Sequence, residues 1–302
     1  MRNTSPFRRR SLIAVAAAGT VLLAACGSTG STAAPGPATT PPPTANGHAG
    51  SSGSMDGMNM AESSPANGLL ASDGGFTLHP LTAEVAASRS SRYQFQITED
   101  DGKVLTAYKV EQTKMLHFYL IRSDLTGFQH LHPTLAADGT WSVEVRPPTA
   151  GAYRVFTQFA AASPSTAAKV VLSTPLTVRG ASSPLEPLPP ATTSTSADGY
   201  TLSVLGSPKA GVAGPLTIDV TKNGAPVKDL QSYLGTYVHL TAFHEGDLGF
   251  AHLHPIDAAN SGLGGPTLHF DAELAEKGRY RLFIQFQADG ALRTAQMTLT
   301  VR

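Results

Sequence analysis

The chain has 302 residues, of which 22 are basic and 22 acidic, so its formal net charge is zero. A balanced charge gives no attraction to nucleic acid, and we expect no nucleic-acid partner. The 29 glycines and 22 prolines are more than a mainly helical protein tolerates, while 41% hydrophobic residues are enough to build packed cores. The composition therefore favours an all-β protein.

The first 26 residues have the pattern of an export signal. Several arginines precede an apolar run, residues 12–25, that is too short to span a membrane comfortably. The run ends in Leu-Ala-Ala-Cys, which resembles a bacterial lipobox, and Cys26 is the chain's only cysteine. We predict that residues 1–26 are a lipoprotein signal peptide and that Cys26 is acylated. An ordinary secretory signal is the alternative, and both the Sec and the twin-arginine export routes remain open.

A lipid on Cys26 predicts the location of the mature protein. It would be exported and held at the outer face of the cytoplasmic membrane, in the cell envelope. No cysteine then remains for a disulfide, a thiolate nucleophile or a cysteine-based metal site. Any metal must therefore be bound by His, Met, Asp or Glu side chains.

Residues 27–66 have the composition of a disordered tether. Ser, Thr, Ala, Gly and Pro dominate, and apolar residues are too few to offset the entropy of ordering. Met55, Met58 and Met60 nevertheless fall within six residues of one another, where no core could bury them. Because thioethers are soft ligands for Cu(I), these methionines are candidate copper ligands. A compositional accident in a linker is the alternative.

The remainder of the chain contains one pattern twice. Residues 73–78 match 198–202, and residues 151–159 match 278–286. In each copy, short alternating apolar runs are separated by turn signals at a spacing of about ten residues, which is typical of a seven-stranded antiparallel sandwich. The pattern predicts an internal duplication of one β domain.

The boundaries follow from the composition. We predict two tandem immunoglobulin-like β-sandwich domains, residues 67–180 and 197–302. The segment between them, residues 181–196, is rich in Pro, Ser and Thr and is expected to be a linker.

Six of the ten histidines belong to a pattern that occurs in both copies. A histidine is followed, after twelve residues, by His-x-His-Pro. The members are His117, His130 and His132 in the first copy, and His239, His252 and His254 in the second. The two-residue period of a strand places His130 and His132 on one face. A hairpin between the two parts makes His117 a neighbour of His132 on that face, unless a bulge shifts the register. We expect three converging imidazoles in each copy.

Three neutral imidazoles suit zinc or copper. Met115 would share the face of His117 and would favour Cu(I), whereas the second copy has Tyr237 at that position. His244 is a further candidate ligand in the second copy, where the first has Arg122. The alternative is architectural, because histidines that bond to backbone carbonyls can pin a turn and duplication would copy such a device.

Other polar groups are less informative. Gln158 and Gln285 occupy matching Phe-x-Gln-Phe positions, where we expect a structural hydrogen bond, with support of the histidines as the alternative. The sequence shows no recognisable nucleophile turn or phosphate-binding loop. The loop carboxylates Asp124, Glu245 and Asp247, which a metal-dependent hydrolase would need, do not match between copies. We therefore expect no enzymatic activity.

The signature Gly-Phe-x-His-Leu-His-Pro, with its upstream histidine, resembles that of the exported YtkA-like, immunoglobulin-like modules found near copper-handling proteins. The resemblance implies a cell-envelope β-sandwich that handles copper or another heavy metal, and it extends to the six histidines of the pattern. The Met-rich tether is similar to those of periplasmic copper carriers, but their order of Met and His within the folded domain is absent here.

Taken together, the sequence predicts a lipoprotein that binds a transition metal at one three-histidine site in each domain. Copper is favoured and zinc is the alternative. The methionines of the tether would collect Cu(I) for sequestration or for transfer to a receiving envelope protein. The competing hypothesis is a surface interaction module whose histidines are architectural.

Overall fold

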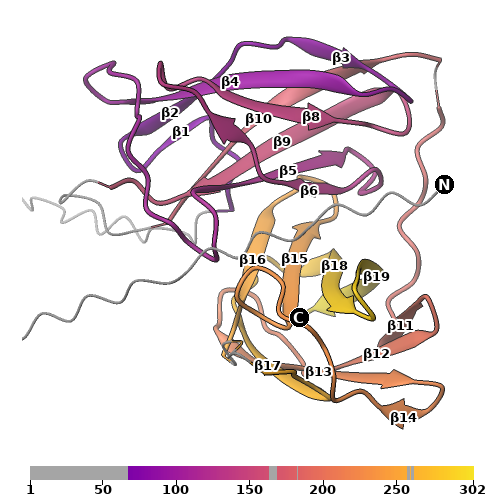
Figure 1. Ribbon diagram of the computed structural model, residues 1–302. Coiled ribbons are helices and arrows are strands. Elements are labelled where there is room, and N and C mark those ends of the chain that lie inside the picture. The colour runs from indigo at the N-terminus through magenta and orange to yellow at the C-terminus, as the bar shows by residue number, and fades with distance from the viewer. Residues whose placement is uncertain (1–66, 163–168, 182, 257–258, 260–261) are drawn as a thin grey trace, which may run out of the picture. The chain divides into compact units, whose positions relative to one another are not determined.

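The computed structural model describes residues 67–302 except 163–168, 182, 257–258 and 260–261 (Figure 1). The predicted signal peptide, Cys26, and the tether with Met55, Met58 and Met60 lie outside the described residues. The described elements are all strands, which confirms the all-β prediction. Within these described ranges, no helix is long and apolar enough to cross a membrane.

The first repeat is a sandwich of two sheets (Figure 1). One sheet has the order β1 (Ser72–Asp73), β2 (Phe76–Pro80), β4 (Ser91–Glu99), β8 (Trp141–Val145) and β7 (Thr134–Leu135). The other has the order β3 (Glu84–Ala86), β10 (Val170–Arg179), β9 (Gly151–Phe159), β5 (Leu116–Arg122) and β6 (Gln129–Leu131).

The second repeat follows the same plan. Its strand order is β11 (Ser194–Ala197), β12 (Tyr200–Leu205), β13 (Gly214–Lys222), β17 (Thr267–Ala272), β16 (Phe250–Pro255), β15 (Val238–His244), β18 (Gly278–Ala288) and β19 (Ala291–Val301), and β14 (Ala225–Pro226) pairs with β13. β16 pairs with both β15 and β17, so it joins the two halves of this sandwich.

Besides the short edge strands β1 and β11, which pair with β2 and β12, seven strands of one repeat have a counterpart in the other. They are β2, β4, β5, β6, β8, β9 and β10, which correspond to β12, β13, β15, β16, β17, β18 and β19. In each repeat three of these strands lie in one layer and four in the other, as in immunoglobulin-like sandwiches. The prediction of two tandem immunoglobulin-like domains is confirmed.

β5 differs from an ordinary sandwich strand because both of its faces are buried. Phe118 lies in the core of the first repeat, whereas the next residue, Tyr119, points to the opposite face and lies in a separate core. That separate core, the junction core, also contains Phe243 and Phe283 of the second repeat. Phe128 stacks on Phe283 with ring centroids 4.0 Å apart. The two repeats therefore pack against each other through the sheets that contain β5 and β15.

The segment between the repeats also packs against them. Leu188 is buried in the junction core. Arg122 donates hydrogen bonds to the backbone carbonyls of Ser183 and Pro184, and β11 begins at Ser194, inside the range predicted to be linker. The segment is therefore part of the packed structure, and it is not a free linker between two separate domains.

Candidate functional site: a histidine cluster between the repeats

β5 and β6 pair in the register that the sequence predicted. Tyr119 lies opposite His130, and the same register places His117 opposite His132. The imidazoles at these positions share one face of the sheet because residues two apart point the same way. The hairpin prediction for the first repeat is confirmed.

The second repeat has the same register. Leu240 lies opposite Leu253, which places His239 opposite His254, and Thr241 lies opposite His252. The duplication therefore extends to the pairing of the strands that carry the histidines.

Three histidines from the two repeats converge at the junction. His117, His130 and His239 each offer a ring nitrogen, and these three atoms lie within 4.8 Å of one another. Only 2%, 8% and 1% of these residues is exposed, respectively. The sequence pattern predicted one cluster within each repeat. The structure brings His239 to the histidines of the first repeat, because the sheets that carry them face each other. The side chains of His252 and His254 lie outside the described part of the chain, so the cluster expected in the second repeat stays a prediction.

Two of these imidazoles are in direct contact. His117 Nδ1 lies 3.1 Å from His130 Nε2. On its other side, the His117 ring donates from Nε2 to the backbone carbonyl of Glu111, at 3.1 Å. His130 Nδ1 lies 2.7 Å from the Oε1 atom of Gln285, which belongs to the second repeat.

The third histidine is held by an aromatic residue that the sequence analysis missed. The hydroxyl of Tyr119 lies 3.3 Å from His239 Nε2. The Tyr119 ring also stacks on His130, with centroids 4.4 Å apart, and His130 stacks on His239 at 4.6 Å. The signal for Tyr119 was its position two residues after His117, which puts it on the same face. Nothing in the sequence singled out the carbonyl of Glu111, because every residue has a backbone carbonyl.

His132 lies at the edge of the cluster. Its ring centroid is 5.2 Å from that of His117 and 4.8 Å from that of His130. The residue is partly exposed, but its Nε2 atom is buried and has no hydrogen-bond partner among the described residues. His132 is thus the member of the cluster nearest to solvent in the first repeat.

The electrostatics of the cluster favour neutral rings. Burial lowers the pKa of His117 below its ordinary value and that of His130 well below it, and the neighbouring His239 and His117 lower the pKa of His130 further. Burial, with smaller contributions from His117 and Lys114, lowers the pKa of His132 to about 4. At neutral pH these imidazoles are therefore uncharged.

Met115 and His244 are the other predicted ligands whose side chains the structure describes. Met115 comes just before β5 and is 40% exposed, in contrast to the buried histidine two residues later. The ring nitrogens of His244 contact the Asp247 carboxylate at 2.8 Å and the Lys277 carbonyl at 3.2 Å. Tyr237, the counterpart of Met115, is buried, and its hydroxyl lies 3.4 Å from the Gly262 carbonyl.

The loop carboxylates are engaged elsewhere. Asp124 pairs with Arg122 at 2.5 Å, and Glu245 pairs with Arg279 at 2.5 Å. Asp247 accepts from the backbone of Gly249 as well as contacting His244. Of the described acidic residues, none belongs to the three-histidine group.

Gln285 reaches a histidine of the other repeat, and Gln158 lies opposite His117 in the pairing of β5 with β9. His79 and His269 are exposed strand residues.

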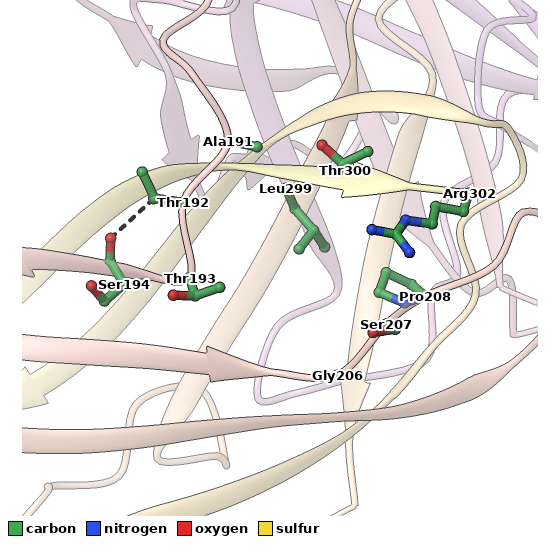
Figure 2. A pocket seen from close by; sticks show the side chains of 10 residues that line it. All are labelled: Ala191, Thr192, Thr193, Ser194, Gly206, Ser207, Pro208, Leu299, Thr300 and Arg302. Atoms are coloured by element: carbon green, nitrogen blue, oxygen red, sulfur yellow. Dashed lines mark hydrogen bonds between the residues drawn. The ribbon is translucent and has the colours of Figure 1, made fainter.

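A groove of about 540 Å³ is separate from the cluster (Figure 2). It is lined by the end of the inter-repeat segment, the turn after β12 and the end of β19. In Figure 2, Thr192 and Ser194 lie on one side of the groove and Arg302 lies on the other. The Thr192 hydroxyl donates a hydrogen bond to the backbone carbonyl of Ser194. Its lining includes no histidine.

Comparison with known proteins agrees with the duplication. The sequence profile of one family, described as a domain of unknown function, DUF8832, matches residues 71–175 and again residues 194–302. The chain belongs to this family. Each β-sandwich is thus one DUF8832 repeat. No curated protein matches the chain.

Similar solved structures include the Escherichia coli adhesin FdeC, with 15% identity and a TM-score of 0.25, and InvD of Yersinia pseudotuberculosis, with 12% and 0.26. Each covers 76% of this chain, and the chain spans 65% and 58% of theirs. Fibronectin(III)-like modules of Clostridium thermocellum CbhA share 10% identity at a TM-score of 0.20, with 75% of this chain and 94% of that one covered. At these scores the likeness carries no argument about function.

Proposed function

We propose that the protein is a cell-envelope lipoprotein that binds a transition-metal ion at a site shared by its two DUF8832 repeats. The observation that carries the proposal is the convergence of His117, His130 and His239, whose ligand atoms lie within 4.8 Å of one another. Copper is the favoured cargo, with zinc as the alternative, for sequestration or for transfer to an envelope protein.

The spacing of the nitrogens supports this assignment. Imidazole nitrogens bind zinc at about 2.0–2.1 Å, so two ligands of a tetrahedral ion lie roughly 3.3 Å apart. The distance of 3.1 Å between His117 Nδ1 and His130 Nε2 is close to this value. The His239 ring would have to move by at most about 1.5 Å to complete a three-nitrogen set. The side chains that would bind the ion are therefore nearly in place.

The protonation state of the histidines also supports the proposal of a metal site. A metal ligand must offer a lone pair, and protons compete with the metal for it. Because burial lowers the pKa of His117 and His130, protons compete weakly at neutral pH. The predicted lipid on Cys26 and the three methionines of the tether fit an envelope protein that acquires Cu(I) outside the cytoplasm.

A second candidate function is architectural. The contacts between Tyr119 and His239 and between His130 and Gln285 both join one repeat to the other. A buried polar network of this kind can specify how two domains dock without binding any ion. In that case the protein would present its docked sandwiches to a protein or glycan partner.

Metal titration separates the two candidates. The full chain, purified in detergent, would be titrated with Cu(I) in competition with a chelator, and separately with Cu(II) and Zn(II). We expect about one tightly bound ion per chain in the wild type and loss of that ion in His130→Ala, while His79→Ala, an exposed strand histidine, binds as the wild type does. Absence of tight binding, or tight Zn(II) binding that survives in His130→Ala, would support the architectural function instead, since the tether methionines would not bind Zn(II).

A further inference from the structure

Four groups form a chain through the cluster. They are Gln285 Oε1, the His130 ring, the His117 ring and the backbone carbonyl of Glu111. The three contacts between successive members measure 2.7, 3.1 and 3.1 Å. The two ends of the chain are oxygen atoms, and amide oxygens accept hydrogen bonds but never donate them.

The acceptors at the two ends decide where the ring protons lie. His117 must donate from Nε2 to the Glu111 carbonyl, so in the neutral ring its Nδ1 carries the lone pair. His130 must donate from Nδ1 to Gln285 Oε1, so its Nε2 carries the lone pair. The 3.1 Å contact between the two rings therefore joins two lone pairs with no proton between them.

Two lone pairs that face each other at this distance repel, unless a cation lies between or beside them. The rings are buried, so an extra proton is disfavoured. A metal ion, in contrast, is bound by lone pairs, so it requires that both nitrogens carry a lone pair and no proton. An outer carbonyl that accepts from the far ring nitrogen is the usual way in which proteins fix the tautomer of a metal-binding histidine.

We propose that Gln285 of the second repeat is the positioning residue of the metal site, because it holds His130 of the first repeat in its Nδ1–H tautomer and so turns Nε2 into a ligand. This inference rests on the proposed function. Its consequence is that the ligand geometry of the first repeat depends on the docking of the second, since Gln285 lies in β18. Metal binding and repeat docking are thereby linked.

The opposite arrangement has a defined signature. If the Gln285 amide group donated to His130 Nδ1, His130 would carry its proton on Nε2 and donate it to His117. The result would be an unbroken hydrogen-bonded chain that ends at the Glu111 carbonyl and leaves no lone pair for a metal. The hydroxyl of Thr294, 3.5 Å from Gln285 Nε2, accepts from that amide group in the arrangement that the structure shows. The tautomer of His130 thus distinguishes positioning of a ligand from pure architecture.

The first test uses the metal-free full chain and does not depend on metal binding. Nitrogen-15 NMR of the histidine rings reports which nitrogen of His130 is protonated. We expect Nδ1–H in the wild type and loss of this preference in Gln285→Leu. An Nε2–H tautomer in the wild type would overturn the inference.

The second test compares variants in Zn(II) and Cu(I) titrations. Gln285→Leu removes the acceptor and is expected to weaken binding by about 10- to 100-fold. Gln285→Glu keeps the acceptor but has no amide donor, so it should retain the wild-type affinity. Gln129→Leu, next to His130 but on the opposite face of β6, is the matched control and should also bind as the wild type does. Thermal unfolding of each metal-free variant checks that it is folded.

The outcomes separate the two proposals. If the wild type binds metal and Gln285→Leu binds equally well, the role of Gln285 is refuted while the metal site stands. If the wild type binds no metal, the proposed function fails, whatever the tautomer. If Gln285→Glu is folded but binds metal more weakly than Gln285→Leu, an acceptor at this position does not support the site, which also refutes the inference.

Discussion

The buried imidazoles of the junction are neutral because the interior disfavours their charged form. His117, His130 and His132 all have a pKa below the ordinary value for histidine. Neutrality makes their lone pairs available to a metal. It also means that folding must exclude protons that the unfolded chain would bind, so the stability of the protein depends on pH.

The direction of that dependence follows from the pKa of His132, which falls from about 6.5 in an unfolded chain to about 4 in the folded protein. Between these values the unfolded chain binds more protons than the folded one. The free energy of unfolding should therefore be greatest above pH 6.5 or so and should fall steadily as the pH drops towards 4.

Urea unfolding of the metal-free chain at pH 7.5 and at pH 5.0 measures the effect. We expect a lower midpoint at pH 5.0 in the wild type and a smaller difference in His132→Gln. His79→Gln, which changes an exposed histidine, should keep the wild-type difference. An equal midpoint at both pH values would contradict the neutral state of the cluster.

Two strands, β5 of the first repeat and β15 of the second, meet at the junction. β5 and β15 are buried on both faces, and the outer faces carry aromatic side chains that form the junction core. Phe243, on β15, is fully buried and its ring contacts those of Phe156, Phe250 and Phe283. The packing of these rings, and not the covalent connection alone, holds the two sheets together.

Truncation of Phe243 tests this packing. Removal of a fully buried phenylalanine ring typically costs 3–5 kcal/mol or so, and we expect Phe243→Ala to lower the free energy of unfolding by about that amount. Leu205→Ala, at a residue that is 53% exposed, should change it by less than about 0.5 kcal/mol. Urea unfolding gives both values, and similar effects of the two substitutions would show that the junction core contributes little.

The same strands show how far the sequence could predict the site. The register that sets His117 opposite His132 followed from the period of a strand and the length of the hairpin, and the pairing of β5 with β6 has this register. These are local properties, which a single sequence encodes directly.

The composite site could not be predicted in this way, because contact between two domains depends on tertiary packing that periodicity does not report. A partial signal was present. Tyr119, Phe128 and Phe156 are aromatic residues on the outer face of their sheet, and Phe250 and Phe283 repeat Phe128 and Phe156 in the second copy. A sandwich with a solvated outer face would carry polar residues there.

For the whole molecule, the junction makes one unit of two sandwiches. The junction core, the buried Leu188 of the connecting segment and the contact from His130 to Gln285 all cross between the repeats. A metal that binds His130 and His239 would add a further link. The sequence predicted three converging histidines in each copy, whereas the structure places His239 of the second repeat beside His117 and His130 of the first.

Cleavage of the connection tests whether the repeats hold together. A protease site would be inserted between Pro190 and Ala191, both of which are exposed. After cleavage we expect the two halves to elute together in size-exclusion chromatography, because the junction core remains buried between them. The same cleavage in Phe243→Ala should release the halves. Separation of the cleaved wild-type protein would show that the repeats do not depend on each other.

The most direct measurement is diffraction at the copper absorption edge from crystals of the copper-loaded full chain. We expect an anomalous peak at the junction, with nitrogen atoms of His117, His130 and His239 at about 2.0–2.1 Å from it, in the range of metal–imidazole bonds. A peak elsewhere on the repeats, or none at the junction in protein that carries copper, would contradict a metal site shared by the two repeats.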